Sequence, residues 1–298
     1  LALAQALMPG SMSATWLEMS PVAGKGQHMK TAIIGDVHGA LGPLQALVAA
    51  LDLCAGDRLV FVGDLVDKGP DSAGVVKFVR KLSETAPYEV ILIEGNHEDR
   101  HRRYHINTAE RPKVARTMAA DAPELPALDA ELSAGDRAFL ATAVPFLHLP
   151  EWGALVVHGG IPGTHRSFPE TVEQASLWHG RRAKAFRKIL RTRYVSAETG
   201  EYLALGANQP DDPFWAEVYD GRFGHVIFGH QPWLDGPACF AHATGLDTAA
   251  VHGGSLPALV LPQTGAPYFK SVPGIDYAPR KTAEWPDHPG GALKLTRP

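Results

Sequence analysis

Five short segments of this chain share one pattern, in which an apolar run is followed by side chains that can bind a metal ion. The polar residues are Asp, His and Asn, so each segment offers carboxylate, imidazole or amide ligand atoms at the end of a candidate strand. The segments are AIIGDVHG with Asp36 and His38, VFVGDLVDKG with Asp64 and Asp67, ILIEGNHED with Asn96 and His97, LVVHGG with His158, and VIFGHQP with His230.

The ligand types in these segments favour a pair of transition-metal ions. Imidazole combined with carboxylate suits Mn, Fe or Zn better than Mg or Ca. Six candidate ligands (two Asp, three His and one Asn) are too many for one four-coordinate zinc. They suit two ions that share a bridging carboxylate. Two divalent ions about 3.5–4 Å apart would stabilise both the attacking and the leaving oxygen at phosphorus. Each motif alone also fits a turn or a structural histidine, so the prediction depends on the ordered set.

Alternation of strands and helices explains how distant residues could meet. KTAIIG, DRLVFVG and YEVILIEG predict strands, and residues 41–53 and 71–83 between them have apolar residues at helical spacing. This order predicts βαβ units and at least a partly parallel sheet, whose carboxyl-terminal strand ends converge on one edge. Residues 98–142 predict a helical insertion, residues 165–192 also look helical, and ALVVHGG and HVIFGHQP predict later strands.

Composition limits the class of protein. The chain has 298 residues, of which 45% are apolar and 20% charged, with a net charge of −4. The negative charge argues against a scaffold that tracks nucleic-acid phosphates. No apolar run approaches the roughly 20 residues of a membrane span. Cys54 and Cys239 match neither a zinc spacing nor a disulfide framework, so we predict a cytoplasmic protein with reduced thiols.

The sequence also suggests boundaries. Residues 1–28 are interpreted as an N-terminal extension or leader, because GKGQHMK looks like a junction and Met29 directly precedes the first strand. Residues 29–272 then form the main domain. Residues 273–298, rich in Pro, Gly and charge, form a C-terminal tail.

The ordered motifs GDVHG, GDLVDKG, GNHED, HGG and GHQP resemble the calcineurin-like metallophosphoesterases. More narrowly, they are similar to the phosphoprotein-phosphatase superfamily and its bacterial relatives, the symmetrical diadenosine tetraphosphatases. The resemblance covers residues 30 to about 262, and Pro232 stands where broader members carry a second late histidine. It implies a four-layer α/β/β/α sandwich with mixed sheets and a helical insertion.

The resemblance also implies a role for each motif residue. A hydroxide bridging two divalent ions, expected to be Mn²⁺ with Fe or Zn as alternatives, would attack phosphorus. His97 would be the general acid, and Asp67 would orient it. The plainer alternatives are a helix cap for His97 and an exposed turn for Asp67. The metal ligands would be Asp36 and His38 on the first ion, Asp64 bridging both, and Asn96, His158 and His230 on the second.

Phosphate binding is where the chain departs from the family. Relatives usually carry Arg at the position of Lys68, and Lys offers a compact point charge instead of a planar fork. Asn96 and a second Arg would also contact phosphate, with Arg193 preferred over Arg191 for that role. His252 would line the pocket or pack beside it.

These features predict a metal-dependent phosphoric ester hydrolase acting on a phosphorylated substrate, which could be a phosphoprotein, a nucleotide or a small ester. The main prediction is a phosphomonoesterase of the Ser/Thr protein phosphatase type. The alternatives are a diadenosine tetraphosphate (Ap4A) hydrolase and a promiscuous phosphodiesterase. A non-catalytic binding module is disfavoured because no ligand of the set is missing.

Overall fold

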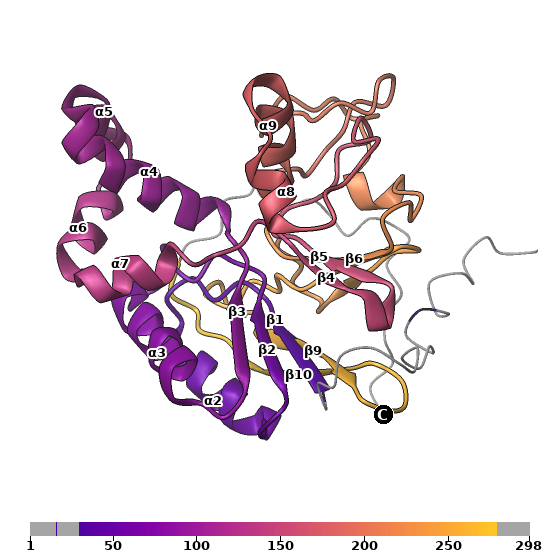
Figure 1. Ribbon diagram of the computed structural model, residues 1–298, viewed down its shortest axis with the longest axis horizontal. Coiled ribbons are helices and arrows are strands. Elements are labelled where there is room, and N and C mark those ends of the chain that lie inside the picture. Colours follow the sequence, from indigo (N-terminus) through magenta and orange to yellow (C-terminus); the bar gives the residue numbers. More distant parts are fainter. Residues whose placement is uncertain (1–15, 17–29, 279–298) are drawn as a thin grey trace, which may run out of the picture.

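Two five-stranded mixed sheets form the centre of the structure, which is a computed structural model that describes Trp16 and residues 30–278 (Figure 1). The first sheet has the order β10-β9-β1-β2-β3. In it, β1, β2 and β3 run parallel, and β9 runs antiparallel to both β1 and β10. Its strands are β1 (Lys30–Ile34), β2 (Arg58–Phe61), β3 (Glu89–Leu92), β9 (Ser255–Pro262) and β10 (Tyr268–Pro273).

The second sheet has the order β4-β5-β6-β8-β7. Its central strands β5, β6 and β8 run parallel, while β4 and β7 pair antiparallel at the two edges. In the first sheet, by contrast, the antiparallel pairs lie on one side only, and the parallel strand β3 forms the other edge. The strands are β4 (Leu147–Leu149), β5 (Ala154–Val156), β6 (His225–Phe228), β7 (Ala238–Cys239) and β8 (Ala243–Gly245).

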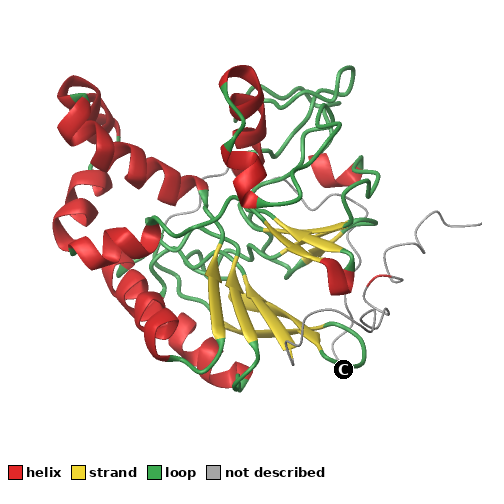
Figure 2. Cartoon of the chain, in the orientation of Figure 1, coloured by secondary structure: helices red, strands yellow, loops and turns green. Residues whose placement is uncertain are grey.

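Helices cover the outer faces of the two sheets and form an arm that projects from the first (Figure 2). Helices α2 (Leu41–Leu51) and α3 (Ser72–Thr85) connect the parallel strands of the first sheet. The arm, at the left of Figure 1, contains α4 (Asn96–Glu110), α5 (Pro112–Asp121), α6 (Glu124–Glu131) and α7 (Ala134–Leu140). Short helices accompany the second sheet: η1 (Pro150–Trp152), α8 (Val172–Ser176), α9 (Gly180–Phe186), η2 (Arg187–Leu190) and η3 (Trp215–Glu217).

Strand periodicity explains the four layers. In β1, Ile33 points into the core between the sheets, whereas its neighbours Ala32 and Ile34 pack in the core that includes α2 and α3. Side chains alternate along a strand, so a strand buried on both faces reads as a continuous apolar run. The same inter-sheet core contains Val60 from β2 and Ile227 from β6. The predicted α/β/β/α sandwich is therefore confirmed.

The helical prediction was accurate in one region and met only by short helices in another. Residues 98–142 contain the four helices of the arm, as expected. Residues 165–192 do not form one long helix but a loop with α8, α9 and η2. Gly180 has a φ of +56°, which an α-helix interior does not accommodate, and the segment is instead anchored by aromatic packing of Phe186 against Phe146 and Phe168.

Most of the predicted leader and tail, together with Met29, lies outside the described residues. Trp16 is described: its ring stacks on His225 at 3.9 Å, and its Nε1 donates to the carbonyl of Trp152. At the other end, the backbone of Gly274 and of Ala278 donates to Gly254 and Val251, respectively. None of the described helices is long and apolar enough to span a bilayer.

Candidate metal centre and active site

All the predicted metal-binding side chains lie just beyond strands that run parallel to one another. Parallel strands direct their carboxyl ends to the same edge, so segments nearly 200 residues apart meet there. Asp36 and His38 follow β1; Asp64, Asp67 and Lys68 follow β2; Asn96 and His97 begin α4 after β3; His158 follows β5; and His230 follows β6.

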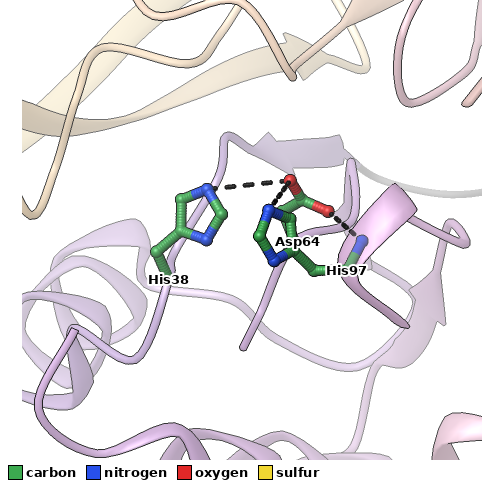
Figure 3. A group of neighbouring side chains, drawn as sticks. All are labelled: His38, Asp64 and His97. Carbon is green, nitrogen blue, oxygen red and sulfur yellow. Dashed lines mark hydrogen bonds and ion pairs between the residues drawn. The ribbon is translucent and has the colours of Figure 1, made fainter. Parts of the chain in front are cut away.

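Two groups of possible metal ligands share one carboxylate. His38, Asp64 and His97 form the first group, and Asp64, His158 and His230 form the second, with the ligand atoms of each group within 4.8 Å of one another. Figure 3 shows the first group, in which dashed lines from the imidazoles of His38 and His97 meet at one oxygen of the Asp64 carboxylate. His38 Nε2 is 3.6 Å and His97 Nε2 3.8 Å from Asp64 Oδ2. A carboxylate common to two groups has the position that a bridging ligand needs.

Backbone carbonyls orient two of the histidines. Nδ1 of His38 lies 2.8 Å from the carbonyl oxygen of Val66, and Nδ1 of His158 lies 2.8 Å from that of Val62. A carbonyl only accepts, so each Nδ1 carries the proton and donates it. The Nε2 atoms then present lone pairs toward Asp64. A fixed tautomer of this kind is the usual outer support of a metal-binding histidine.

Acceptor atoms converge in the second group. His158 Nε2 lies 3.0 Å from Asn96 Oδ1 and 3.3 Å from Asp64 Oδ1. Oxygen atoms and an imidazole lone pair repel one another at these distances unless a cation or a proton lies between them. This donor set therefore fits a divalent transition-metal ion.

Asp36 fits a cation for a second reason. Its Oδ2 accepts a hydrogen bond of 3.0 Å from the backbone of His230, but its Oδ1 is buried without a hydrogen-bond partner among the described residues. Burial, together with the carboxylates of Asp247 and Asp64, raises the pKa of Asp36 well above its usual range. A nearby divalent cation would reverse this effect and keep Asp36 ionised.

Burial also keeps two imidazoles neutral. It lowers the pKa of His38 well below its ordinary value, and the charge of Lys68 adds to the effect. Burial likewise lowers the pKa of His230, with Arg193 as the next cause. Neutral imidazoles have a free lone pair, so both residues are ready to act as ligands.

Asp67 joins two histidines. Its Oδ2 accepts from His97 Nδ1 at 2.6 Å, and its Oδ1 accepts from His101 Nε2 at 2.7 Å. Burial opposes ionisation of this carboxyl, but the bonds from His101 and His97 outweigh it and hold the pKa of Asp67 below its ordinary value. Asp67 is buried, which excludes the exposed-turn alternative.

Backbone strain concentrates at this edge. Seven non-glycine residues have a positive φ in the described part of the chain, and five of them belong to the site. Each such conformation costs energy and persists only where surrounding contacts enforce it. The five are His38, Asp64, Asp67, Lys68 and His230.

Glu98 provides one of these enforcing contacts. Its buried carboxylate accepts 2.8 Å bonds from the backbone N–H groups of Asp64 and Leu65, and a 3.0 Å bond from that of Gly95. One side chain thus joins the loop after β2 to the loop after β3. This contact fixes the position of Asp64 relative to Asn96 and His97.

A cleft of about 550 Å³ opens beside the two groups. Lys68 lines it, with its Nζ 3.1 Å from His38 Nε2. Arg193 lines it too: Nη2 donates to the carbonyl of His230 at 2.9 Å, and Nε is buried with no hydrogen-bond partner among the described residues. Arg191 also reaches the cleft, but its Nη2 is paired with Asp99 at 2.7 Å. His252 also lines the cleft, which favours the first of the two roles expected for it.

The structure brings together every residue that the motifs singled out, and it adds three that sequence reasoning missed. His101 lies four positions after His97 on α4, a spacing that places both on one helix face. Asp247 follows β8, so it carries the same signal of an acid after a strand. Glu98 gave no signal, because the groups that donate to its carboxylate are backbone N–H groups, two of them in the loop after β2.

A strand-edge centre of this kind defines a class of metal-dependent phosphoesterases. The family model described as calcineurin-like phosphoesterase matches residues 29–234, and the chain belongs to this family. It is therefore a metal-dependent phosphoric ester hydrolase.

Individual relatives narrow the comparison. The chain is 30% identical over 247 residues to the asymmetrical bis(5'-nucleosyl)-tetraphosphatase PrpE of Oceanobacillus iheyensis, covering 79% of this chain and 90% of the relative. It is 28% identical over 275 residues to the symmetrical bis(5'-nucleosyl)-tetraphosphatase of Cellvibrio japonicus, covering 80% of this chain and 97% of the relative.

A solved structure shares the fold. A crystal structure provisionally described as a diadenosine tetraphosphatase superposes with a TM-score of 0.62 at 24% identity, covering 86% of this chain and 99% of that one. The named relatives favour the alternative prediction, an Ap4A hydrolase, over the main prediction of a Ser/Thr-type phosphomonoesterase.

Replacing Glu98 should destabilise the site loops. In Glu98→Gln, an amide N–H would face backbone donors, and charge-assisted bonds of this kind contribute about 1.5–3 kcal/mol each. We expect the free energy of unfolding, measured by urea denaturation, to fall by about 3 kcal/mol. Glu124→Gln, which alters a more exposed ion pair with Arg100, is the matched control and should change it by less than about 1 kcal/mol. Equal effects of the two changes would contradict the role assigned to Glu98.

Asp67 should make stability depend on acid pH. Its pKa is lower in the folded chain than in the unfolded chain, so its contribution is fully present above about pH 4 and is lost as the pH falls toward the folded value. We expect Asp67→Asn, unfolded in urea with a chelator present, to show a shallower loss of stability between about pH 4 and 2. Asp121→Asn, exposed on α5, should keep the wild-type slope. An unchanged slope in Asp67→Asn would exclude this linkage.

Proposed function

We propose that this protein hydrolyses dinucleoside tetraphosphates of the Ap4A type. The observation that carries the proposal is the single cleft that joins both ligand groups to Lys68, Arg193 and two tyrosines. A site for a simple phosphate ester needs the ligand groups, Lys68 and Arg193, but it does not need the tyrosines. The addition of a cationic and aromatic extension suits a substrate with several phosphates and a nucleoside, and the relatives named as tetraphosphatases support that substrate class.

The bond that is cut would be a phosphoanhydride. Symmetrical cleavage of Ap4A gives two ADP, whereas asymmetrical cleavage gives ATP and AMP. The relatives include both kinds, so product analysis distinguishes them for this chain. In either case water adds to one phosphorus, and the leaving phosphate departs with the second nucleoside.

We assign the ligand roles as the motifs suggest. Asp36 and His38 would hold one ion, Asp64 would bridge, and the second ion would be held by Asn96, His158 and His230. When bound, two divalent ions activate the attacking water and neutralise the phosphate oxygens. We propose Mn²⁺ for both, because mixed imidazole and carboxylate ligands suit it, with Fe or Zn as alternatives.

His97 would act as the proton donor to the leaving oxygen. Its Nδ1 is held by Asp67, so its Nε2 is directed to the side of the Asp64 carboxylate. A carboxylate on one nitrogen of an imidazole stabilises the protonated ring and fixes its orientation. His101 holds the other oxygen of Asp67, and it would act as a positioning residue for this pair.

Lys68 and Arg193 would bind the phosphates, together with Asn96. Arg193 is favoured over Arg191 because its Nε faces no internal partner, whereas Arg191 is paired with Asp99. Lys68 supplies a point charge that tolerates several phosphate orientations. Such tolerance suits a flexible polyphosphate chain better than one fixed monoester.

The remaining assignments follow from the sequence. We propose residues 29–272 as the catalytic domain, with 98–142 as its helical insertion. Cytoplasmic localisation is proposed from the two cysteines, which are free thiols in the structure, Cys239 buried and Cys54 exposed.

A substrate panel tests the proposed function. With Mn²⁺ supplied, we expect kcat/KM for Ap4A to exceed that for a phosphoserine peptide, an aryl phosphomonoester and an aryl phosphodiester by at least about a hundredfold, which corresponds to about 2.7 kcal/mol of transition-state binding. Nucleotide products would be separated by ion-exchange chromatography. A chelator should remove the activity. Asp64→Asn should lower it by more than about a hundredfold, because loss of even an outer-shell partner of a metal ligand costs up to about a hundredfold in activity. A phosphopeptide cleaved as well as Ap4A would contradict the proposal.

Removing the charge of Lys68 should weaken catalysis. Lys68→Met keeps the length of the side chain but loses the cation, and loss of one electrostatic contact at a reacting phosphate lowers the rate by about 10²–10³. Lys68→Arg should retain kcat/KM within about tenfold because the charge remains. The control is Lys81→Met, an exposed change on α3, which should leave kinetics unaltered. Wild-type kcat/KM in Lys68→Met would exclude phosphate binding by this residue.

A further inference from the structure

One wall of the catalytic cleft is formed by a single short segment with aromatic and aliphatic side chains. Tyr194, Tyr202, Leu203 and Leu205 all line the cleft. Leu205 is 61% exposed, although it is apolar, so part of this wall faces solvent. Phosphate groups gain nothing from such a surface. A flat ring system does, because its faces are apolar and polarizable while its edges stay hydrated.

The wall is fixed in place by the chain around it. Val195 pairs with Tyr202 and Tyr194 with Phe214 as isolated antiparallel bridges, and the N–H of Leu203 donates to the carbonyl of Tyr194 at 3.1 Å. The ring of Tyr194 meets that of Phe214 edge-on, with centroids 6.1 Å apart. The two tyrosines are therefore preorganised, which lowers the entropy lost when a ligand binds.

Lys188 adds a further restraint on the wall. Its Nζ lies 5.3 Å from the centroid of the Tyr202 ring, within the range of a cation–π contact. A ring restrained in this way can act as a stacking surface without first being ordered by its ligand.

The groups that line the cleft are of the kinds that a nucleotide needs. His230 belongs to the second ligand group, Arg193 Nη2 bonds to the carbonyl of His230, and Tyr194 follows Arg193 directly in the chain. The cleft therefore combines metal ligands, a cation bonded beside one of them, and aromatic rings. A nucleoside polyphosphate presents a reacting phosphate, further phosphates and then a base.

We propose that Tyr194, Tyr202 and Leu205 form a nucleobase subsite, which stacks a purine of the substrate while Arg193 binds the phosphates next to it. This subsite deepens the proposed function and rests on it. Stacking on aromatic rings contributes about 1–3 kcal/mol per base and depends little on which base is bound. The wall would therefore select nucleoside polyphosphates over phosphoproteins while leaving the identity of the base open.

The experiment separates base binding from phosphate binding. The Mn²⁺-loaded protein would be assayed with Ap4A, and two competitive inhibitors would be compared: ADP, which carries a base, and inorganic tripolyphosphate, which does not. In Tyr202→Ala we expect KM for Ap4A and the inhibition constant of ADP to rise about tenfold, within the range for loss of one stacking contact. The kcat value and the inhibition constant of tripolyphosphate should change less than threefold.

Three further variants complete the test. Tyr202→Phe retains the ring and should bind ADP as the wild type does. Leu205→Ala changes an exposed side chain without risk to the fold, and it should raise the inhibition constant of ADP about two- to fivefold. Tyr268→Ala alters another half-exposed tyrosine, on β10 and outside the cleft lining, and should have no effect.

Each outcome is decisive. Selective weakening of ADP and Ap4A in Tyr202→Ala and Leu205→Ala supports the subsite. Equal weakening of ADP and tripolyphosphate would mean that the wall acts only through Arg193, and unchanged constants in both variants would exclude base binding there. If the wild-type protein does not hydrolyse Ap4A but does hydrolyse the other esters, the proposed function itself fails, and the two failures are thus distinguishable.

Discussion

Repulsion among buried carboxylates is the constraint on which the site depends. Asp36, Asp64 and Asp247 come from three different strands and lie in one buried region, where burial and mutual charge raise the pKa of Asp36 and Asp247. Asp64 differs, because burial opposes its ionisation but its interactions with His158 and His97 outweigh burial and lower its pKa. A nearby cation would make the whole arrangement favourable, and the His and Asp clusters that share Asp64 could hold divalent ions that supply it.

The two packed sheets hold these buried acidic side chains in place. The inter-sheet core fixes the strands, and the loops beyond them adopt strained backbone conformations that Glu98 and the backbone carbonyls of Val62 and Val66 enforce. A rigid base with strained loops keeps ligand atoms in place before any ligand arrives. The irregular segment after β5 supplies part of the wall of the cleft.

Particular residues show how far the sequence could be read. The strands, the helical arm and the ligand set followed from apolar runs and from the polar residues that end them, because local periodicity is written in the chain. Residues 165–192 looked helical but form only the short helices α8, α9 and η2, because tertiary packing of Phe186 and a positive φ at Gly180 interrupt the helical pattern. The sequence analysis preferred Arg193 over Arg191 for phosphate binding, and the structure adds that Asp99 pairs with Arg191.

The sequence by itself determined the class of chemistry, because each ligand segment carries its own signal of an apolar run followed by Asp, His or Asn. Tertiary structure alone decided what surrounds those ligands. It placed His101 against the second oxygen of Asp67 and let Glu98 bind the backbone of two loops. It also brought Tyr194 and Tyr202 into the same cleft as His230. These contacts join residues that are distant in the chain or lie in irregular segments. A local sequence pattern cannot predict them, because the two partners meet only after the chain has folded.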